Sequence, residues 1–375
     1  MKQLLTFVVI CAAWFAANIP FESRGCTSWM VFSDLTRNNT NILHKNRDSK
    51  SKNIIAYLSG PEAKRKWVAL GNTPAGVNAG MNSSGLAGVM NSGERCIDPP
   101  NKGKKGFDTT VMMRIILESC DTAKQAVAKL EELVKEKKYN HGDKGSIFFF
   151  CDTNEGYVCE MTAEYCSSQQ ITRGFTVRAN VWHNPNMYEL NRNTLGAHLH
   201  SAARMYMAIS LLNKAIDDNK KITVSDSFEI SRHFQMPENA AMKRSLCGLD
   251  TNAGATLEID REYPDVLSTL YVTIGPPRNT LYMPLPICAE KLHPAMSNYR
   301  WSEAAWKHFD AVSFKAPIAK EWSEFEAAAT AKVAKAKVEA RKLLKSGKRA
   351  EAVKLINSTA EALWDEAAAL LKISK

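Results

Sequence analysis

Alternating polar and apolar residues after position 25 predict a β-hairpin at the start of a folded domain. Residues 27–33 alternate and are rich in strand formers, 34–40 have the composition of a turn, and 41–46 predict the returning strand. A glycine-punctuated block over 76–93 favours further paired strands joined by tight turns. Additional strands are predicted at 146–151, 157–162, 175–183, 266–274 and 280–284.

Apolar residues at helical spacing lie between these strand groups. They predict a helix pair over 108–135 and single helices over 195–218 and 223–233. Strand groups that alternate with helices indicate an α+β fold, in which helices pack on stacked sheets. The alanine-rich tail, 301–375, differs in composition and predicts two helices joined by a turn at 346–348. We expect this tail to be a helical extension that packs on the body or joins copies into a homo-oligomer.

Charge adds little to this outline, except in the tail. The net charge of the 375-residue chain is +10, and over 332–354 nine basic residues face two acidic ones. No aromatic-and-basic module accompanies this stretch, so we expect no nucleic-acid partner. A solvated helix face is the simpler interpretation, and binding to an acidic polymer or a membrane headgroup is the alternative.

Residues 1–25 have the pattern of a secretory signal peptide followed by a short propeptide. Lys2 is followed by an apolar run over 4–17 and by small residues suited to cleavage. The run is too short to span a bilayer comfortably, and no later stretch approaches about 20 apolar residues. We therefore expect an exported protein, periplasmic or extracellular, without an integral membrane segment. Lipoprotein-like attachment at Cys11 is a minor alternative.

Eight cysteines remain after this leader, and none of them has CxxC spacing. We expect core thiols or one or two disulfides and no zinc site. They are Cys26, Cys96, Cys120, Cys151, Cys159, Cys166, Cys247 and Cys288.

Cys26 follows the leader directly, in the segment Gly25-Cys26-Thr27-Ser28. A cut between Gly25 and Cys26 would leave a thiol and a free α-amine on adjacent carbons. Their ordinary pKa values are about 8.5 and about 7.7–8.0. One residue can then supply both the nucleophile and the base that removes its proton. On its own this short motif also allows a buried or disulfide-bonded cysteine.

Further motifs in the right order resemble the N-terminal-nucleophile hydrolases of the choloylglycine hydrolase and penicillin acyltransferase type. The resemblance covers about 26–290 and implies a four-layer αββα sandwich, with a catalytic domain over 26–300. The motifs are Cys26-Thr27-Ser28 as the mature start, 43–48 as the end of the first hairpin, 80–91 as a turn and strand, 177–180, 201–204 and the closing segment 275–284.

The resemblance also implies a role for each matched residue. Cys26 attacks an amide carbonyl, and Asp48 holds the amine in place. Asn91 and Asn180 direct side-chain N–H groups at the developing oxyanion, where one donor is worth on the order of 10²–10³ in rate. Arg204 orients Asp48 or lowers the thiol pKa. The alternatives are ordinary ones: a turn carboxylate, amides at strand edges and a surface arginine.

One position departs from the bile-salt-type pattern. Lys45 stands where those members have an arginine, and the arginine of this chain comes two residues later, at Arg47. Lysine keeps the positive charge but lacks the planar fork of arginine. We retain Lys45 as a site residue, with Arg47 second, and the change favours the acyltransferase-like branch. His183 and His200 are not needed as bases and are interpreted as core or surface residues.

These features predict an exported, self-activating cysteine amidohydrolase that cleaves a C–N amide bond of a small N-acylated compound through a thioester. No metal or cofactor is required, and signatures such as G-x-S-x-G and HExxH are absent from the sequence. A dipeptidase or an acyltransferase on the same scaffold remains open. The alternative from another class is a non-enzymatic protein that binds an anionic surface through 332–354.

Overall fold

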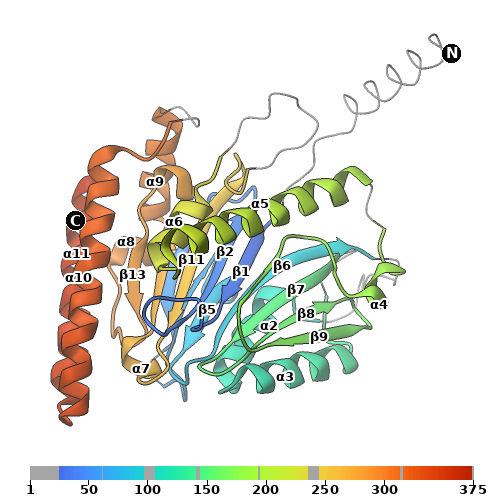
Figure 1. Ribbon diagram of the computed structural model, residues 1–375, viewed down its shortest axis with the longest axis horizontal. Coiled ribbons are helices and arrows are strands. Elements are labelled where there is room, and N and C mark those ends of the chain that lie inside the picture. Colours follow the sequence, from blue (N-terminus) through green and yellow to red (C-terminus); the bar gives the residue numbers. More distant parts are fainter. Residues whose placement is uncertain are drawn as a thin grey trace.

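Two antiparallel sheets stacked face to face form the centre of the molecule (Figure 1). The computed structural model describes residues 25–60, 62–96, 106–140, 144–192, 195–234, 245–312 and 316–373. Of the predicted signal peptide and propeptide, 1–25, residues 1–24 lie outside the described residues. None of the helices in the described ranges has the length and the apolar character needed to cross a membrane.

The first sheet, called sheet I, contains the predicted hairpin. β1 lies between β10 and β2, with Ser28 opposite Arg178 on one side and Thr27 opposite Asn46 on the other. The start of β1 is therefore held by two neighbouring strands that both carry motif residues. In spatial order the strands of sheet I are β10 (Phe175–Arg178), β1 (Thr27–Val31), β2 (Asn41–Asp48), β11 (Thr251–Ile259), β12 (Thr269–Thr273) and β13 (Met283–Pro286).

The second sheet, sheet II, follows the chain order from β3 to β9. Its strands are β3 (Ile55–Leu58), β4 (Trp67–Gly71), β5 (Ala79–Asn82), β6 (Ala87–Arg95), β7 (Lys144–Cys151), β8 (Gly156–Met161) and β9 (Cys166–Ile171). β6 faces β1 and β2 of sheet I across the interior.

Helices cover the outer face of each sheet and complete four layers. The predicted helix pair is confirmed as α2 (Thr109–Ser119) and α3 (Ala123–Lys135), which pack on sheet II. α5 (Leu195–Asn219) and α6 (Val224–Ser231) pack on sheet I. The α+β class and the αββα layering are thus confirmed. Short helical turns are α4 (Pro185–Tyr188), α7 (Pro264–Leu267), α8 (Pro294–Ser297) and the 3₁₀ turn η1 (Pro277–Asn279).

Several strand predictions were wrong in extent. The strand expected over 280–284 begins only at Met283, as β13. The strand expected over 175–183 ends at Arg178, and the chain then leaves the sheet carrying Asn180. The strand expected over 266–274 is preceded by α7, because Pro264 occupies the first helical turn, where proline is well tolerated. The sheet strand β12 begins only at Thr269.

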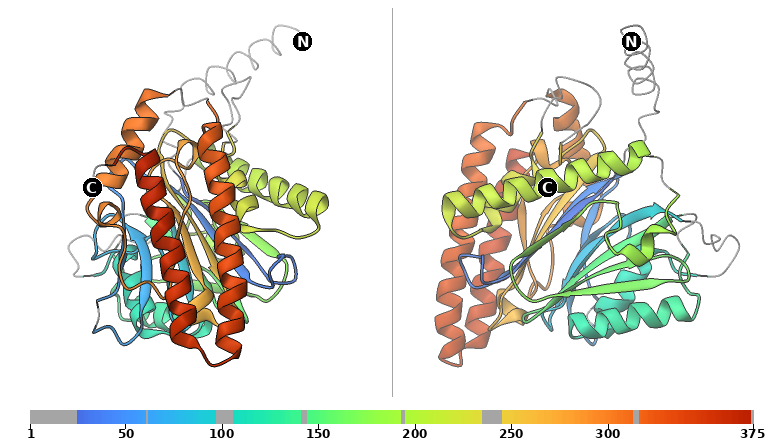
Figure 2. Two further views of the ribbon diagram at one scale, coloured as in Figure 1. Left: turned by 90° about the vertical axis from the view of Figure 1, so that its left-hand side faces the viewer. Right: turned by 45° about the vertical axis from the view of Figure 1, so that its right-hand side comes forward.

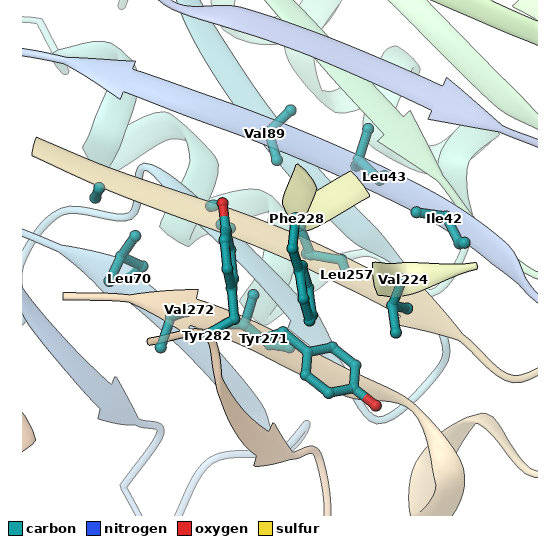
Figure 3. Packing of buried hydrophobic residues seen from close by; sticks show 14 of the residues in the cluster. Ile42, Leu43, Leu70, Val89, Val224, Phe228, Leu257, Tyr271, Val272 and Tyr282 are labelled. Atoms are coloured by element: carbon teal, nitrogen blue, oxygen red, sulfur yellow. The ribbon is translucent and has the colours of Figure 1, made fainter. Parts of the chain in front are cut away.

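The tail shares the hydrophobic core of the sandwich. α9 (Arg300–Ala311), α10 (Lys320–Lys345) and α11 (Arg349–Leu370) follow β13, and the last two lie side by side along one flank (Figure 2). Trp322 and Trp364 belong to the same buried cluster as Phe228 and Tyr282, whose rings stack at 4.1 Å (Figure 3). Trp364 also donates through Nε1 to the carbonyl oxygen of Pro284 in β13 at 2.8 Å.

Part of the basic face of α10 is paired with the body of the same chain. Lys337 Nζ lies 2.6 Å from a carboxylate oxygen of Glu258 in β11, and Arg341 forms ion pairs with Asp260 and Glu262. The prediction of a wholly solvated face was therefore wrong for Lys337 and Arg341. Their charge anchors the tail, because the acidic end of β11 lies beneath it. The predicted turn at 346–348 is confirmed, with Gly347 at a φ of 74°.

Candidate active site

Cys26 lies at the entrance to β1, with its side chain almost fully buried. Burial disfavours the thiolate, but the ammonium group of Lys45, which also hydrogen-bonds to the sulfur, has the opposite effect. The backbone N–H of Asp48 donates to the thiol as well, and the pKa of Cys26 lies below its ordinary value despite the nearby Asp48 carboxylate. A lower pKa means more of the nucleophilic thiolate at neutral pH.

Lys45 extends from β2 across the gap between the sheets. Its Nζ donates to the carbonyl oxygen of Met90 and, at 3.0 Å, to Oδ1 of Asn91, both in β6. The Ser28 hydroxyl donates to the same Oδ1 at 2.8 Å. Burial lowers the pKa of Lys45, against the effect of the Cys26 thiolate beside it. Asn91 therefore acts as the acceptor that orients the ammonium group toward the sulfur.

Asp48 ends β2 and holds the main chain just before Cys26. Its Oδ2 accepts from the backbone N–H of Gly25 at 3.3 Å, and its Oδ1 accepts from the Thr251 hydroxyl at 2.6 Å. Arg204 Nη1 lies 3.8 Å from Oδ2. Burial raises the pKa of Asp48 even so, because the Arg204 charge and these hydrogen bonds only partly compensate for lost solvation. The carboxylate thus lies beside the main chain that leads into Cys26.

Arg204 reaches the same place from α5. Its Nη1 donates to the carbonyl oxygen of Cys26 at 3.2 Å, and its Nη2 donates to Oδ1 of Asn180 at 2.8 Å. The prediction that Arg204 lies at Asp48 agrees with this geometry. The guanidinium connects the Cys26 carbonyl, the Asp48 carboxylate and the segment after β10.

The structure brings all six predicted site residues together at one end of the sandwich, from β1, β2, β6, α5 and the segment after β10. The amide nitrogens of the two expected oxyanion donors are engaged elsewhere in this uncleaved chain. Asn180 Nδ2 donates to the carbonyl oxygen of Ser92 at 2.6 Å, and Asn91 Nδ2 donates to those of Arg178 and Ala179. Their role as oxyanion donors stays a prediction.

Thr251 was not identified from the sequence. Its hydroxyl fixes Asp48, but it lies in β11, some 200 positions away, and only the pairing of β11 with β2 brings the two together. Ser28 did carry a signal, because it completes the Cys-Thr-Ser motif. All eight described cysteines are free thiols, so the alternative of disulfides is not observed. Across the described ranges, no group of three or more His, Cys, Asp or Glu residues is placed to hold a metal ion.

The comparison with protein families adds independent information. Residues 35–238 match the family described as acyl-coenzyme A:6-aminopenicillanic acid acyl-transferase, and they make up more than half of the chain. The chain belongs to this family. The resemblance drawn from the motifs is confirmed, although the matched region begins after Cys26, so the evidence for the nucleophile is its position and surroundings.

The chain also has weaker similarities to solved structures. A conjugated bile acid hydrolase variant from Clostridium perfringens aligns with a TM-score of 0.48 and 11% identity, over 71% of this chain and 93% of that one. Penicillin V acylase from Agrobacterium tumefaciens aligns with a TM-score of 0.44 and 14% identity, over 69% and 86%. A comparison with curated protein sequences finds no significant match.

Lys45→Met is expected to shift the pH midpoint of Cys26 alkylation to a higher pH. The charge of Lys45 is the largest influence that offsets burial at the thiol, so its loss should raise the pKa of Cys26. The rate of alkylation at Cys26, followed by peptide mass spectrometry across pH, measures the midpoint. Lys50→Met, at an exposed position just beyond β2, is the control and should leave the midpoint unchanged. An unshifted midpoint in Lys45→Met would contradict the assigned role.

Proposed function

We propose that this chain is an exported, self-activating cysteine amidohydrolase that cleaves the C–N amide bond of a small N-acylated compound. The observation that carries the proposal is the placement of the Cys26 thiol. It is buried, activated by Lys45, and adjacent to a peptide whose flanking groups are held by Asp48 and Arg204. Membership of an acyl-transferase family supports the same chemistry, since hydrolysis is acyl transfer to water.

Maturation would use the same sulfur as catalysis. The Cys26 thiolate attacks the Gly25 carbonyl carbon, the C–N bond breaks, and the Cys26 nitrogen takes up a proton to become an amine. The resulting thioester joins residue 25 to the sulfur. Water hydrolyses it, which releases the leader with a new carboxylate and returns the free thiol.

In the mature enzyme the new amine would accept the thiol proton as the sulfur attacks a substrate amide. The ammonium form then gives a proton to the departing amine, and the acyl group remains on Cys26 as a thioester until water removes it. Asp48 supports the proposed step because a buried carboxylate already lies at the main chain before Cys26 and can stabilise the ammonium form. Arg204 contacts both that carboxylate and the Cys26 carbonyl oxygen and fixes their relative position.

Transfer of the acyl group to an amine is the second candidate, favoured by the description of the matched family. It shares every step up to the thioester and differs only in what removes the acyl group. A reaction that contains an amine acceptor distinguishes the two, because transfer gives a new amide whereas hydrolysis gives the free acid.

Export is proposed from the composition of 1–25.

Self-cleavage predicts that the purified protein begins with Cys26, and that Gly25→Ala retards its formation. A Cβ at Gly25 would clash with Arg204 Nη2 and with Asn180 Oδ1, so the scissile peptide would be displaced. We expect maturation to slow by about 10- to 100-fold, as followed by intact mass over time.

The processed product is its own control. Residue 25 leaves with the leader, so fully processed Gly25→Ala protein has the wild-type sequence and should have the wild-type kcat/KM. A wild-type chain that starts at any other residue would refute the proposal, and normal maturation of Gly25→Ala would refute the steric argument.

A further inference from the structure

Arg47 lies beside the nucleophile, on the same face of β2 as Lys45. Side chains of a strand alternate between its faces, so positions 45 and 47 point to the same side. Thr27 pairs with Asn46, and continuing this register by one residue brings Cys26 to the level of Arg47. Directly opposed residues of antiparallel strands have Cα atoms about 4.5–5.5 Å apart.

Two asparagine side chains hold the Arg47 guanidinium in place. Nη1 donates to Oδ1 of Asn252 at 2.9 Å, and Nη2 donates to Oδ1 of Asn72 at 2.5 Å. Each asparagine is oriented in turn, because its Nδ2 donates to backbone carbonyls of the segment after β2, at Ser49, Ser51 and Asn53. Arg47 is therefore pre-positioned, and two of its five N–H donors are occupied by these contacts.

The other buried arginines of the described chain have a carboxylate partner, and Arg47 does not. Arg178 lies 3.2 Å from Glu160, Arg204 lies 3.8 Å from Asp48, and Arg232 lies 2.7 Å from Glu326. Arg47 is only 9% exposed, yet no described carboxylate lies within 4.0 Å of it, and its partners are neutral amides.

This imbalance of charge calls for an anion. Lys45, Arg47 and Arg204 surround Cys26 with three cationic groups. The Asp48 carboxylate acts on the charge of all three, but it lies more than 4.0 Å from the guanidinium of Arg47. A buried charge without a counter-ion in contact is destabilising. The Arg47 guanidinium is nevertheless kept and is oriented by two amides, so it is available to bind an anionic ligand. The free N–H groups of a guanidinium match the two oxygens of a carboxylate.

We propose that Arg47 binds a carboxylate of the substrate, so that the enzyme acts on acylated compounds with an anionic group within a few bonds of the scissile amide. N-acyl amino acids are the simplest members of this class. The inference rests on the proposed function, because it places the substrate amide at Cys26. Arg47 would then determine the preference of the enzyme for anionic over neutral substrates.

Alkylation of Cys26 by two small reagents tests this directly and needs no substrate. Iodoacetate carries a carboxylate next to its reactive carbon, whereas iodoacetamide is its neutral counterpart. The ratio of their rates at Cys26 is expected to fall about 10- to 100-fold in Arg47→Gln relative to wild type. Arg47→Lys, which keeps the charge but loses the fork, should give an intermediate ratio, and Arg173→Gln, at an exposed position, should match wild type.

Matched substrates then test the substrate class. We expect wild-type kcat/KM to be about 10- to 100-fold higher for an N-acylglycine than for the corresponding N-acylglycinamide, and Arg47→Gln to remove that preference. A monoamide of a dicarboxylic acid places the carboxylate on the acyl side and shows on which side of the amide Arg47 binds.

The outcomes separate the two proposals. An alkylation ratio that is the same in wild type and Arg47→Gln, or equal cleavage of the charged and neutral amides, would overturn the inference while leaving the amidase standing. An unprocessed chain that still discriminates iodoacetate through Arg47 would overturn the amidase instead.

Discussion

Replacing Cys26 with alanine is expected to abolish both maturation and amide cleavage. The substitution removes the only atom that both proposed reactions attack with, and loss of a covalent nucleophile lowers kcat by about 10⁴-fold or more. Intact mass should then show a chain that retains the residues before position 26, and the release of free acid from an N-acyl amino acid should fall to background.

A second cysteine gives the matched control. Cys166 in β9 is partly exposed, and burial together with the Glu131 carboxylate raises its pKa to about 12. Cys166→Ala should mature and cleave substrate as the wild type does. Normal processing of Cys26→Ala would contradict self-activation. If Cys26→Ala keeps its biological function and reversal of the exposed charges of α10 abolishes it, the non-enzymatic alternative is correct.

Glu326→Gln is expected to lower the free energy of unfolding by about 3–5 kcal/mol, the range for breaking one partner of a buried ion pair. Glu326 in α10 pairs with Arg232 through two contacts of 2.7 Å, and both side chains are buried. The backbone N–H of Tyr282 donates to the same carboxylate at 2.6 Å. Glutamine would leave Arg232 charged in the core, with only the largely exposed Glu229 carboxylate, at 3.4 Å, as a counter-ion. Urea denaturation can measure the loss of stability.

The control for this variant lies one half-turn away on the same helix. Glu324→Gln removes a carboxylate that pairs with Lys320 at 3.6 Å on the surface, where such a pair contributes at most about 1 kcal/mol. Equal stability of the two variants would contradict the view that the tail is fastened through Glu326. A large loss in Glu326→Gln alone would show that 301–375 is an integral part of the fold.

The sequence predicted the elements whose patterns are local. The first hairpin and the helix pair α2–α3 have clear periodicity, and Gly347 marks the turn of the tail. β11 was missed because its sequence, Thr251–Ile259, contains asparagine, glycine, alanine and glutamate and yet is buried on both faces. Its strand structure comes from pairing with β2 and β12, and β-propensity depends strongly on such context.

The candidate site divides in the same way. The closeness of Cys26, Lys45 and Asp48 could be predicted from the sequence, because they belong to one hairpin, and the family resemblance implied their roles. Thr251 and the surroundings of Arg47 could not, because contacts across β2 and β11 join residues about 200 positions apart. Even the sign of the Cys26 pKa shift needed the structure, since burial and the Lys45 charge act in opposite directions.

The position of β1 between β10 and β2 has a consequence for the mature protein. Chain ends usually fray, because little holds their last residues. Here a proteolytic end would arise at the start of a strand that was already part of the sheet before the cut. The entropic cost of ordering this backbone, about 1–2 kcal/mol per residue, is therefore met when the uncut chain folds. The new amine, and the thiol beside it, would therefore be held in fixed positions from the moment of the cut.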